Sequence, residues 1–260
     1  MNGYRWGWIK TILLLSGSFA FAFLLGEMVH ELGHFLAHRS VGTGQAGIHL
    51  DPFGGSRIYG ATALPLDLMG ITTAAGPFLN LAGGSLFTLL LWPRRRPELL
   101  PLILWGPVAL IQEGVNLALG LLSPGCDARW IAAWGVPNWL LAALGVGCLI
   151  LGTGGISRIL SAGAIPGKSS FWERFLLIFF GLAFLIILRG VVSLLISPAA
   201  AGENLVPLAF AILLAAVISG LQGSRRSGSG GEESFSATWG ASLLAAGLGL
   251  GLLLAQVILP

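Results

Sequence analysis

The sequence predicts an all-α membrane protein, a polytopic helix bundle of about seven spans with a short β-hairpin or re-entrant loop after the first span. Of its 260 residues, 55% are hydrophobic and only 10% are charged. The mean hydropathy is +0.86. Soluble domains usually carry about 25% charged residues. A chain this poor in charge needs lipid as its solvent, so we expect a multi-pass protein of the cell membrane whose first partner is the bilayer.

Seven segments supply the apolar length of about 20 residues that a spanning helix needs. They are 9–38, 65–92, 99–122, 137–153, 171–196, 205–221 and 238–258. The fourth is short, and its helix could begin earlier than 137, near Asp127. We divide the chain into a three-span core, 1–135, and a second part, 136–260, of additional transmembrane helices that scaffold the core or recruit partners.

A glycine-rich segment, 39–64, connects the first two spans. Within it, 48–51 (Ile-His-Leu-Asp) alternates apolar and polar residues, as a short strand does. The sequence Pro-Phe-Gly-Gly follows at 52–55 and is typical of a turn. We therefore expect a β-hairpin or looped strand here, with Gly54 and Gly55 at its turn.

Basic residues give a prediction of membrane orientation. Ten of the fourteen Lys and Arg residues lie in the N-terminal segment and in alternate connections, whereas the other connections hold three. The positive-inside rule then places the N-terminus in the cytoplasm and the end of the first span outside. The net charge of +3 is too small to suggest a nucleic-acid partner.

The strongest chemical signal is the sequence His30-Glu31-Leu32-Gly33-His34. Histidines four positions apart lie about 40° apart on a helix, so both imidazoles can reach one metal ion. The glutamate between them is placed to accept a proton from water. Because His and Glu are costly within a lipid-embedded run, their presence there favours a functional site over a polar cluster between helices.

A catalytic zinc ion takes three protein ligands, so a third must come from elsewhere in the chain. The remaining candidates are Asp51, Asp67, Glu113, Asp127, His38 and His49. The two histidines lie near the C-terminal end of the first span. Asp127 follows the third span and so emerges on the same side, as does the start of the second. Topology therefore favours Asp127, with Glu113 as the alternative.

Three motifs together resemble those of the site-2 protease family of intramembrane zinc metalloproteases. They are His30–His34 within a span, Ala75–Asn80 in the next span, and Ser123–Asp127 after the third. The resemblance covers the three-span core, about half of the chain. Asp127 departs from the family pattern because Ala128, not glycine, follows it.

The resemblance implies that zinc is held by His30, His34 and Asp127 and that Glu31 is the general base. It implies hydrolysis of peptide bonds in membrane-spanning substrate helices. Asn80 falls in the Gly-Pro-x-x-Asn motif of the family, and Asn116 could match an asparagine that precedes the ligand aspartate. The loop with Gly54 and Gly55 resembles the β-loop that such enzymes use near substrate, where an exposed strand edge can pair with an unwound helix.

Other interpretations remain open from the sequence. Glu27, three residues before His30, either holds a ligand imidazole or pairs with a neighbouring helix. The chain could be a non-catalytic membrane subunit or adaptor that keeps a structural zinc site, or a metal transporter. The family resemblance also implies a site nearer the cytoplasm, opposite to the orientation that the charges predict.

Overall fold

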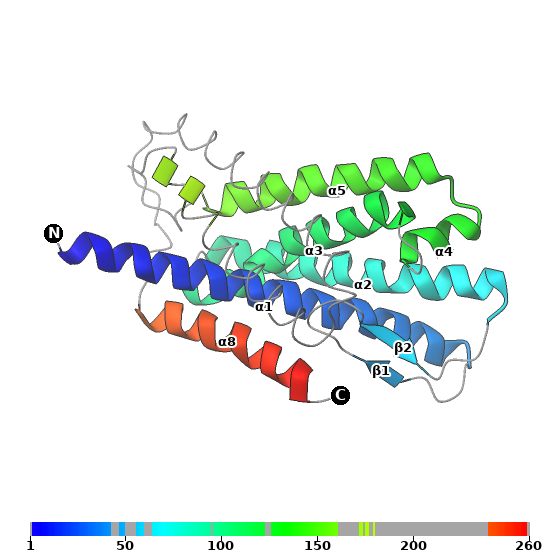
Figure 1. Cartoon of the computed structure of the whole chain (residues 1–260), viewed down its shortest axis with the longest axis horizontal. Coiled ribbons are helices and arrows are strands. Elements are labelled where there is room, and N and C mark those ends of the chain that lie inside the picture. Colours follow the sequence, from blue (N-terminus) through cyan, green and yellow to red (C-terminus); the bar gives the residue numbers. More distant parts are fainter. Residues whose placement is uncertain are drawn as a thin grey trace.

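The computed structural model describes residues 2–42, 47–49, 56–59, 64–94, 96–122, 126–160, 172–173, 175–176, 179 and 239–258. Within these ranges the protein is a bundle of long helices lying roughly along one axis (Figure 1). The helices and strands are α1 (Asn2–Ser40), β1 (Gly47–His49), β2 (Arg57–Tyr59), α2 (Leu66–Leu91), η1 (Trp92–Arg94), η2 (Pro97–Leu99), α3 (Leu100–Leu119), η3 (Gly120–Leu122), α4 (Asp127–Ala133), α5 (Asn138–Ile159) and α8 (Trp239–Ile258).

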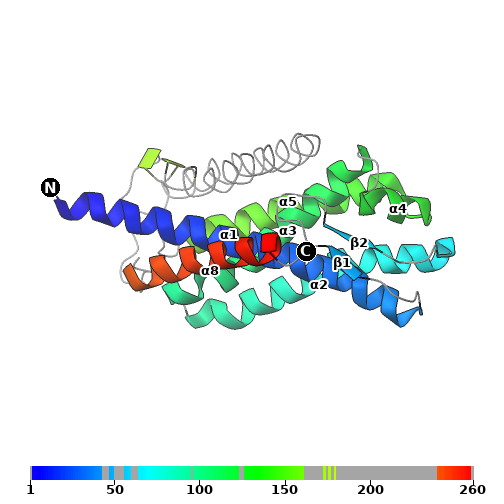
Figure 2. The same cartoon turned by 60° about the horizontal axis from the view of Figure 1, so that its bottom comes forward.

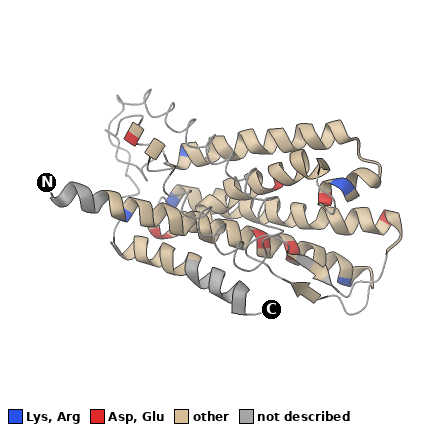
Figure 3. Cartoon of the chain, in the orientation of Figure 1, with Lys and Arg blue, Asp and Glu red and all other residues tan. Residues whose placement is uncertain are grey.

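Four helical segments are long and apolar enough to cross a membrane. They are Trp8–Ser40, Leu66–Arg94, Pro97–Leu122 and Asn138–Ile159, and they coincide with the first four spans that the sequence predicts. Charged residues are sparse along the bundle (Figure 3). The predicted last span, 238–258, is helical as α8. The predicted spans 171–196 and 205–221 fall almost entirely outside the described residues.

The segment after α1 contains two paired strands. β1 and β2 run antiparallel, with Gly47 opposite Tyr59 and His49 opposite Arg57. Both strands lie against α1. Residues 50–55, which include Asp51 and the expected turn glycines Gly54 and Gly55, lie outside the described residues.

The fourth long helix, α5 (Asn138–Ile159), begins where the predicted span 137–153 begins and not at the earlier start near Asp127. α4 ends at Ala133 and α5 starts at Asn138, so Asp127 belongs to a separate short helix. Gly135 has φ +113°, a value that a residue with a Cβ rarely adopts. Pro137, directly before α5, lacks an N–H and disfavours helical geometry at the residue before it. Together these two residues explain why the chain turns here instead of continuing one helix.

Helix α1 lies at the centre of the described bundle. It packs against α2, α3 and α8, and α3 in turn packs against α2 and α5. α8 lies alongside the N-terminal half of α1 in both views (Figures 1 and 2). This leaves the C-terminal half of α1, which carries the His-Glu-x-x-His motif, to meet α2 and α3.

A polar contact fixes α2 against α3 at a helix defect. Pro107 lies inside α3, and because it has no N–H, the carbonyl of Ile103 loses its helical donor. The Thr88 hydroxyl from α2 donates to that carbonyl at 2.8 Å, and the Gly106 N–H donates to the same hydroxyl at 3.1 Å. Because the contact supplies a donor to a carbonyl that the helix leaves unpaired, it stabilises the pairing of α2 and α3.

Candidate metal centre

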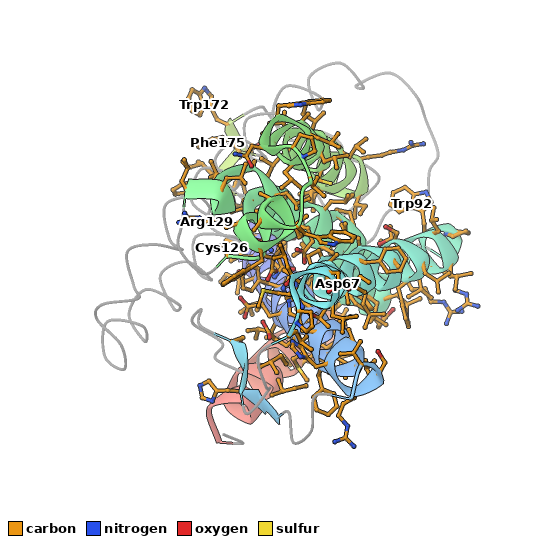
Figure 4. All side chains as sticks on the ribbon, turned by 90° about the vertical axis from the view of Figure 1, so that its right-hand side faces the viewer. Asp67, Trp92, Cys126, Arg129, Trp172 and Phe175 are labelled. Carbon is orange, nitrogen blue, oxygen red and sulfur yellow. The ribbon has the colours of Figure 1, made fainter. Side chains whose placement is uncertain are left out.

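Three side chains that are distant in sequence meet near one end of the bundle. One nitrogen each of His30 and His34 and one oxygen of Asp127 all lie within 4.8 Å of one another. The histidines come from α1 and the aspartate from the first turn of α4. Figure 4 views the bundle from this end, where Cys126 and Arg129, neighbours of Asp127 in the sequence, are labelled. Among the described residues, this is the one group of His, Cys, Asp and Glu side chains that could hold a metal ion.

The spacing of the donor atoms suits a tetrahedral ion. Donors about 2.0–2.1 Å from a tetrahedral zinc ion are about 3.3 Å apart. The two histidine Nε2 atoms are 3.0 Å apart. The His30 Nε2 lies 2.9 Å from Asp127 Oδ2, and the His34 Nε2 lies 3.5 Å from Asp127 Oδ1. These separations bracket the tetrahedral value, so the three side chains need little movement to bind a zinc ion.

The Nδ1 atom of His34 is held by the backbone of α2. It lies 2.9 Å from the carbonyl oxygen of Thr72, which can only accept, so Nδ1 carries the proton and Nε2 presents its lone pair. Thr72 lies on the turn before Pro77, and a proline inside a helix displaces the carbonyls of the preceding turn. The Gly-Pro pair thus stands next to the carbonyl that orients this histidine.

Two glycines allow α1 and α2 to approach closely at the site. A Cβ on Gly33 would lie 2.5 Å from the Ala75 carbonyl oxygen and 2.8 Å from the Gly76 Cα. A Cβ on Gly76 would collide with the imidazole of His34, at Nε2 and Cε1. These contacts are shorter than real Cβ contacts. The Cβ at position 33 would meet the backbone of α2, and the Cβ at position 76 would meet the His34 ring, which is held at both nitrogens. Glycine is therefore required at both positions.

Gly76→Ala is expected to displace the His34 ring and to weaken zinc binding by at least the ~10-fold typical of a disturbed ligand environment. Zinc affinity of the purified protein, measured by competition with a chelator, tests this. Gly147→Ala is the matched control, because a Cβ there meets no atom within 4 Å. Equal zinc affinity in the two variants would show that His34 tolerates the displacement.

The Nδ1 atom of His30 faces a buried carboxylate. It lies 2.9 Å from Oε1 of Glu113 on α3, and the same oxygen accepts a hydrogen bond of 2.7 Å from the Asn80 side chain on α2. The sequence analysis left open whether Glu27 holds a ligand imidazole. The Nδ1 atoms of His30 and His34 face other groups, Glu113 and the Thr72 carbonyl, and the role of Glu27 stays a prediction.

Asp127 is also held by a side chain of α3. Asn116 on α3 donates to its Oδ2 at 2.9 Å, although eleven positions separate the two residues in the sequence. Burial alone would raise the pKa of Asp127, but when the imidazoles of His30 and His34 are protonated, their hydrogen bonds and positive charge hold that pKa well below the usual range. The carboxyl group is therefore ionised near neutral pH, which is the form that binds a metal ion.

Comparison of the chain with known protein families, with curated proteins and with solved structures found no match. The resemblance to the site-2 protease family therefore depends on the three short motifs of the sequence.

The charges of the centre also suit a cation. Glu31, Glu113 and Asp127 bring three carboxylates close to two imidazoles. The accepting carbonyl of Thr72 assigns the proton of His34 to Nδ1, so its Nε2 lone pair faces the Nε2 atom of His30 at 3.0 Å. Two such nitrogens repel unless a proton or a metal ion lies between them. A divalent cation relieves this repulsion and offsets the buried negative charge.

The structure locates most of the residues that the sequence singled out. His30, Glu31, His34, Asp127, Asn80 and Asn116 gather at the centre. Asn80 is fully buried, with both ends of its amide occupied, so it supports the site and does not face a substrate. The sequence did not reveal that the Thr72 carbonyl contacts His34, or that the indole of Trp105 donates a hydrogen bond to Asn80. Glu113, which the sequence kept as the alternative third ligand, carried a usable signal: the cost of placing a carboxylate in an apolar span.

Proposed function

We propose that this protein is an intramembrane zinc metalloendopeptidase that hydrolyses peptide bonds of membrane-spanning substrate helices, in the manner of the site-2 protease family that its motifs resemble. One observation carries the proposal: the two histidines of a His-Glu-x-x-His motif converge with Asp127 inside a bundle whose helices are long and apolar enough to span a membrane. Catalytic zinc sites use three protein ligands of this kind.

Each residue of the centre has a separate role in this proposal. His30, His34 and Asp127 hold the ion. Zinc bound there supplies Lewis-acid chemistry, since it polarises a carbonyl group and makes water a stronger nucleophile. Glu31 takes the proton of the attacking water and passes it to the leaving amine. Its side chain is 7% exposed, so it acts shielded from bulk water, where a carboxylate base is more effective.

Two other classes of function are compatible with a buried metal site. An adaptor with a structural zinc site needs no general base, whereas this centre has Glu31 between its histidines. A transporter lines its pathway with polar groups from several spans near mid-depth. Here the ligands gather at the C-terminal end of α1 and the start of α4, which favours a hydrolytic centre over a transport pathway.

Removal of the metal is expected to stop cleavage reversibly. The full chain, reconstituted in lipid vesicles with tagged single-span substrate proteins, should release shortened fragments. A zinc chelator should abolish the fragments, and added Zn²⁺ should restore them. Substrates with helix-weakening Gly or Pro residues in the span should be cleaved fastest, because a peptide bond must leave the helix before it can be hydrolysed.

Two outcomes would contradict the proposal. Fragments that persist at full rate after zinc has been removed would exclude metal-dependent hydrolysis. Protein that binds one zinc ion and cleaves no member of the substrate panel, while carrying Zn²⁺ across the vesicle membrane, would establish the transporter instead.

A further inference from the structure

A chain of hydrogen bonds runs from the indole of Trp105 to His30 through two buried side chains. Trp105 Nε1 lies 3.0 Å from Asn80 Oδ1, Asn80 Nδ2 lies 2.7 Å from Glu113 Oε1, and His30 Nδ1 lies 2.9 Å from that same oxygen. Its members come from three helices, α1, α2 and α3. We propose that Glu113, oriented by Asn80 and Trp105, is a positioning residue that sets the tautomer and angle of His30 for metal binding.

The direction of every hydrogen bond in this chain follows from the indole. Trp105 Nε1–H can only donate, so the atom of Asn80 that faces it must be the amide oxygen. The amide nitrogen of Asn80 must then face Glu113, whose Oε1 accepts its hydrogen bond. Because that oxygen accepts from both sides, the His30 Nδ1 atom facing it carries a proton. The lone pair of His30 is thereby assigned to Nε2, the atom that faces Asp127 and His34.

Burial makes this arrangement rigid. Glu113 is 1% exposed and Asn80 is 0% exposed, so no water competes for their hydrogen bonds. A carboxylate that accepts from a ligand imidazole makes the opposite nitrogen a stronger base toward the metal and restrains ring rotation. The cost of burying Glu113 is recovered when a cation lies at the far side of the ring.

The same geometry argues against Glu113 as a metal ligand. The Oε1 atom of Glu113 faces Nδ1 of His30, whereas Asp127 and His34 lie at the Nε2 side of the ring. The two carboxylates therefore stand at opposite edges of one imidazole. Only Asp127 is placed to share an ion with both histidines.

Zinc affinity of the full-length protein, measured by chelator competition, tests the proposal without any assay of cleavage. Glu113→Leu keeps the side-chain volume and removes the acceptor, so it should weaken zinc binding about 10–100-fold. Glu113→Gln keeps an accepting oxygen and loses the charge, so its zinc affinity should fall between that of the unaltered protein and that of Glu113→Leu. Asn80→Leu should weaken binding by less than Glu113→Leu, because the His30–Glu113 contact survives in a looser form.

A double variant separates positioning from general loss of packing. Since Asn80 acts through Glu113, Asn80→Leu should have no further effect on zinc affinity in the Glu113→Leu protein, whereas independent effects would multiply. Gln112→Leu is the structural control: it removes a neighbouring, partly buried hydrogen bond from α3 to the Phe23 carbonyl and should leave zinc affinity unchanged. With saturating Co²⁺ in place of zinc, the Glu113→Leu visible spectrum should keep the form of the unaltered protein.

Four results would overturn the inference: unchanged zinc affinity in Glu113→Leu, multiplied losses in the double variant, an equal loss in Gln112→Leu, or an altered cobalt spectrum that makes Glu113 a ligand.

The role of Glu113 deepens the proposed function, but the two fail separately. A protein that binds zinc through this chain and cleaves nothing would refute only the peptidase. Cleavage with a Glu113→Leu affinity equal to that of the unaltered protein would refute only the positioning role.

Discussion

Replacing Glu31 with glutamine is expected to abolish cleavage of membrane substrates while one zinc ion stays bound per chain. The ligand atoms belong to His30, His34 and Asp127, and glutamine has the shape of glutamate, so the metal should be held within a few-fold of its original affinity. Glutamine cannot accept the proton of water. Loss of a general base typically lowers a rate by about 10²–10⁴, which places the variant below detection in a fragment assay.

Parallel measurements of bound zinc and of fragment release give the result directly. Glu98→Gln serves as the matched control, because Glu98 is exposed in η2, before α3 begins, and belongs to no part of the centre. It should cleave at the original rate. If Glu31→Gln retained more than a tenth of the activity, or lost its zinc, Glu31 would not be the base and the roles assigned to the centre would need revision.

The helices could be predicted from the sequence because each depends on a local property. An apolar run of about 20 residues has few alternatives to a spanning helix, and α1, α2, α3 and α5 formed where such runs lie. The boundary before α5 depends on Gly135 and Pro137, and the predicted start of the fourth span at 137 agrees with it. The pairing of His30 with His34 was equally local, since four residues make one helical turn.

Contacts between helices could be predicted only in part. Alternation of the spans brought Asp127 to the histidines, because that argument needs only the side of the membrane. Whether Glu27 or Glu113 meets an imidazole depends on the rotation of α1 and α3 about their axes, which composition does not determine. Glu27 was the closer residue in sequence, yet the Nδ1 atom of His30 meets α3.

Asn116 shows how sequence distance can mislead in the other direction. Asn116 lies eleven positions before Asp127, a longer separation than the family pattern suggests. In the structure, α3 ends in the 3₁₀ turn η3 (Gly120–Leu122). The chain then enters α4 at Asp127, close enough for Asn116 to donate to its carboxylate. The meaning of Gly33 and Gly76 was likewise hidden, since each is explained only by the helix or ring that it lets approach.

Asp127→Ala is expected to weaken zinc binding more than any change to a partner of the ligands. Asp127 supplies the negative charge among the three donors, and its removal leaves two neutral imidazoles, too few for a catalytic zinc site. The loss should therefore exceed the about 10–100-fold expected for a group that only supports a ligand. Chelator competition across both variants should rank Asp127→Ala below Glu113→Leu in zinc affinity.

The ranking decides between the two carboxylates that the sequence left as candidates for the third ligand. Asn116→Leu is the control for Asp127, because it removes only the hydrogen bond to Oδ2 and should cost far less than loss of the carboxylate. Asp127→Asn keeps the shape and removes the charge, so its affinity should lie between those of Asn116→Leu and Asp127→Ala. If Asp127→Ala bound zinc normally while Glu113→Leu bound none, the ion would lie on the other edge of His30 and Glu113 would be its third ligand.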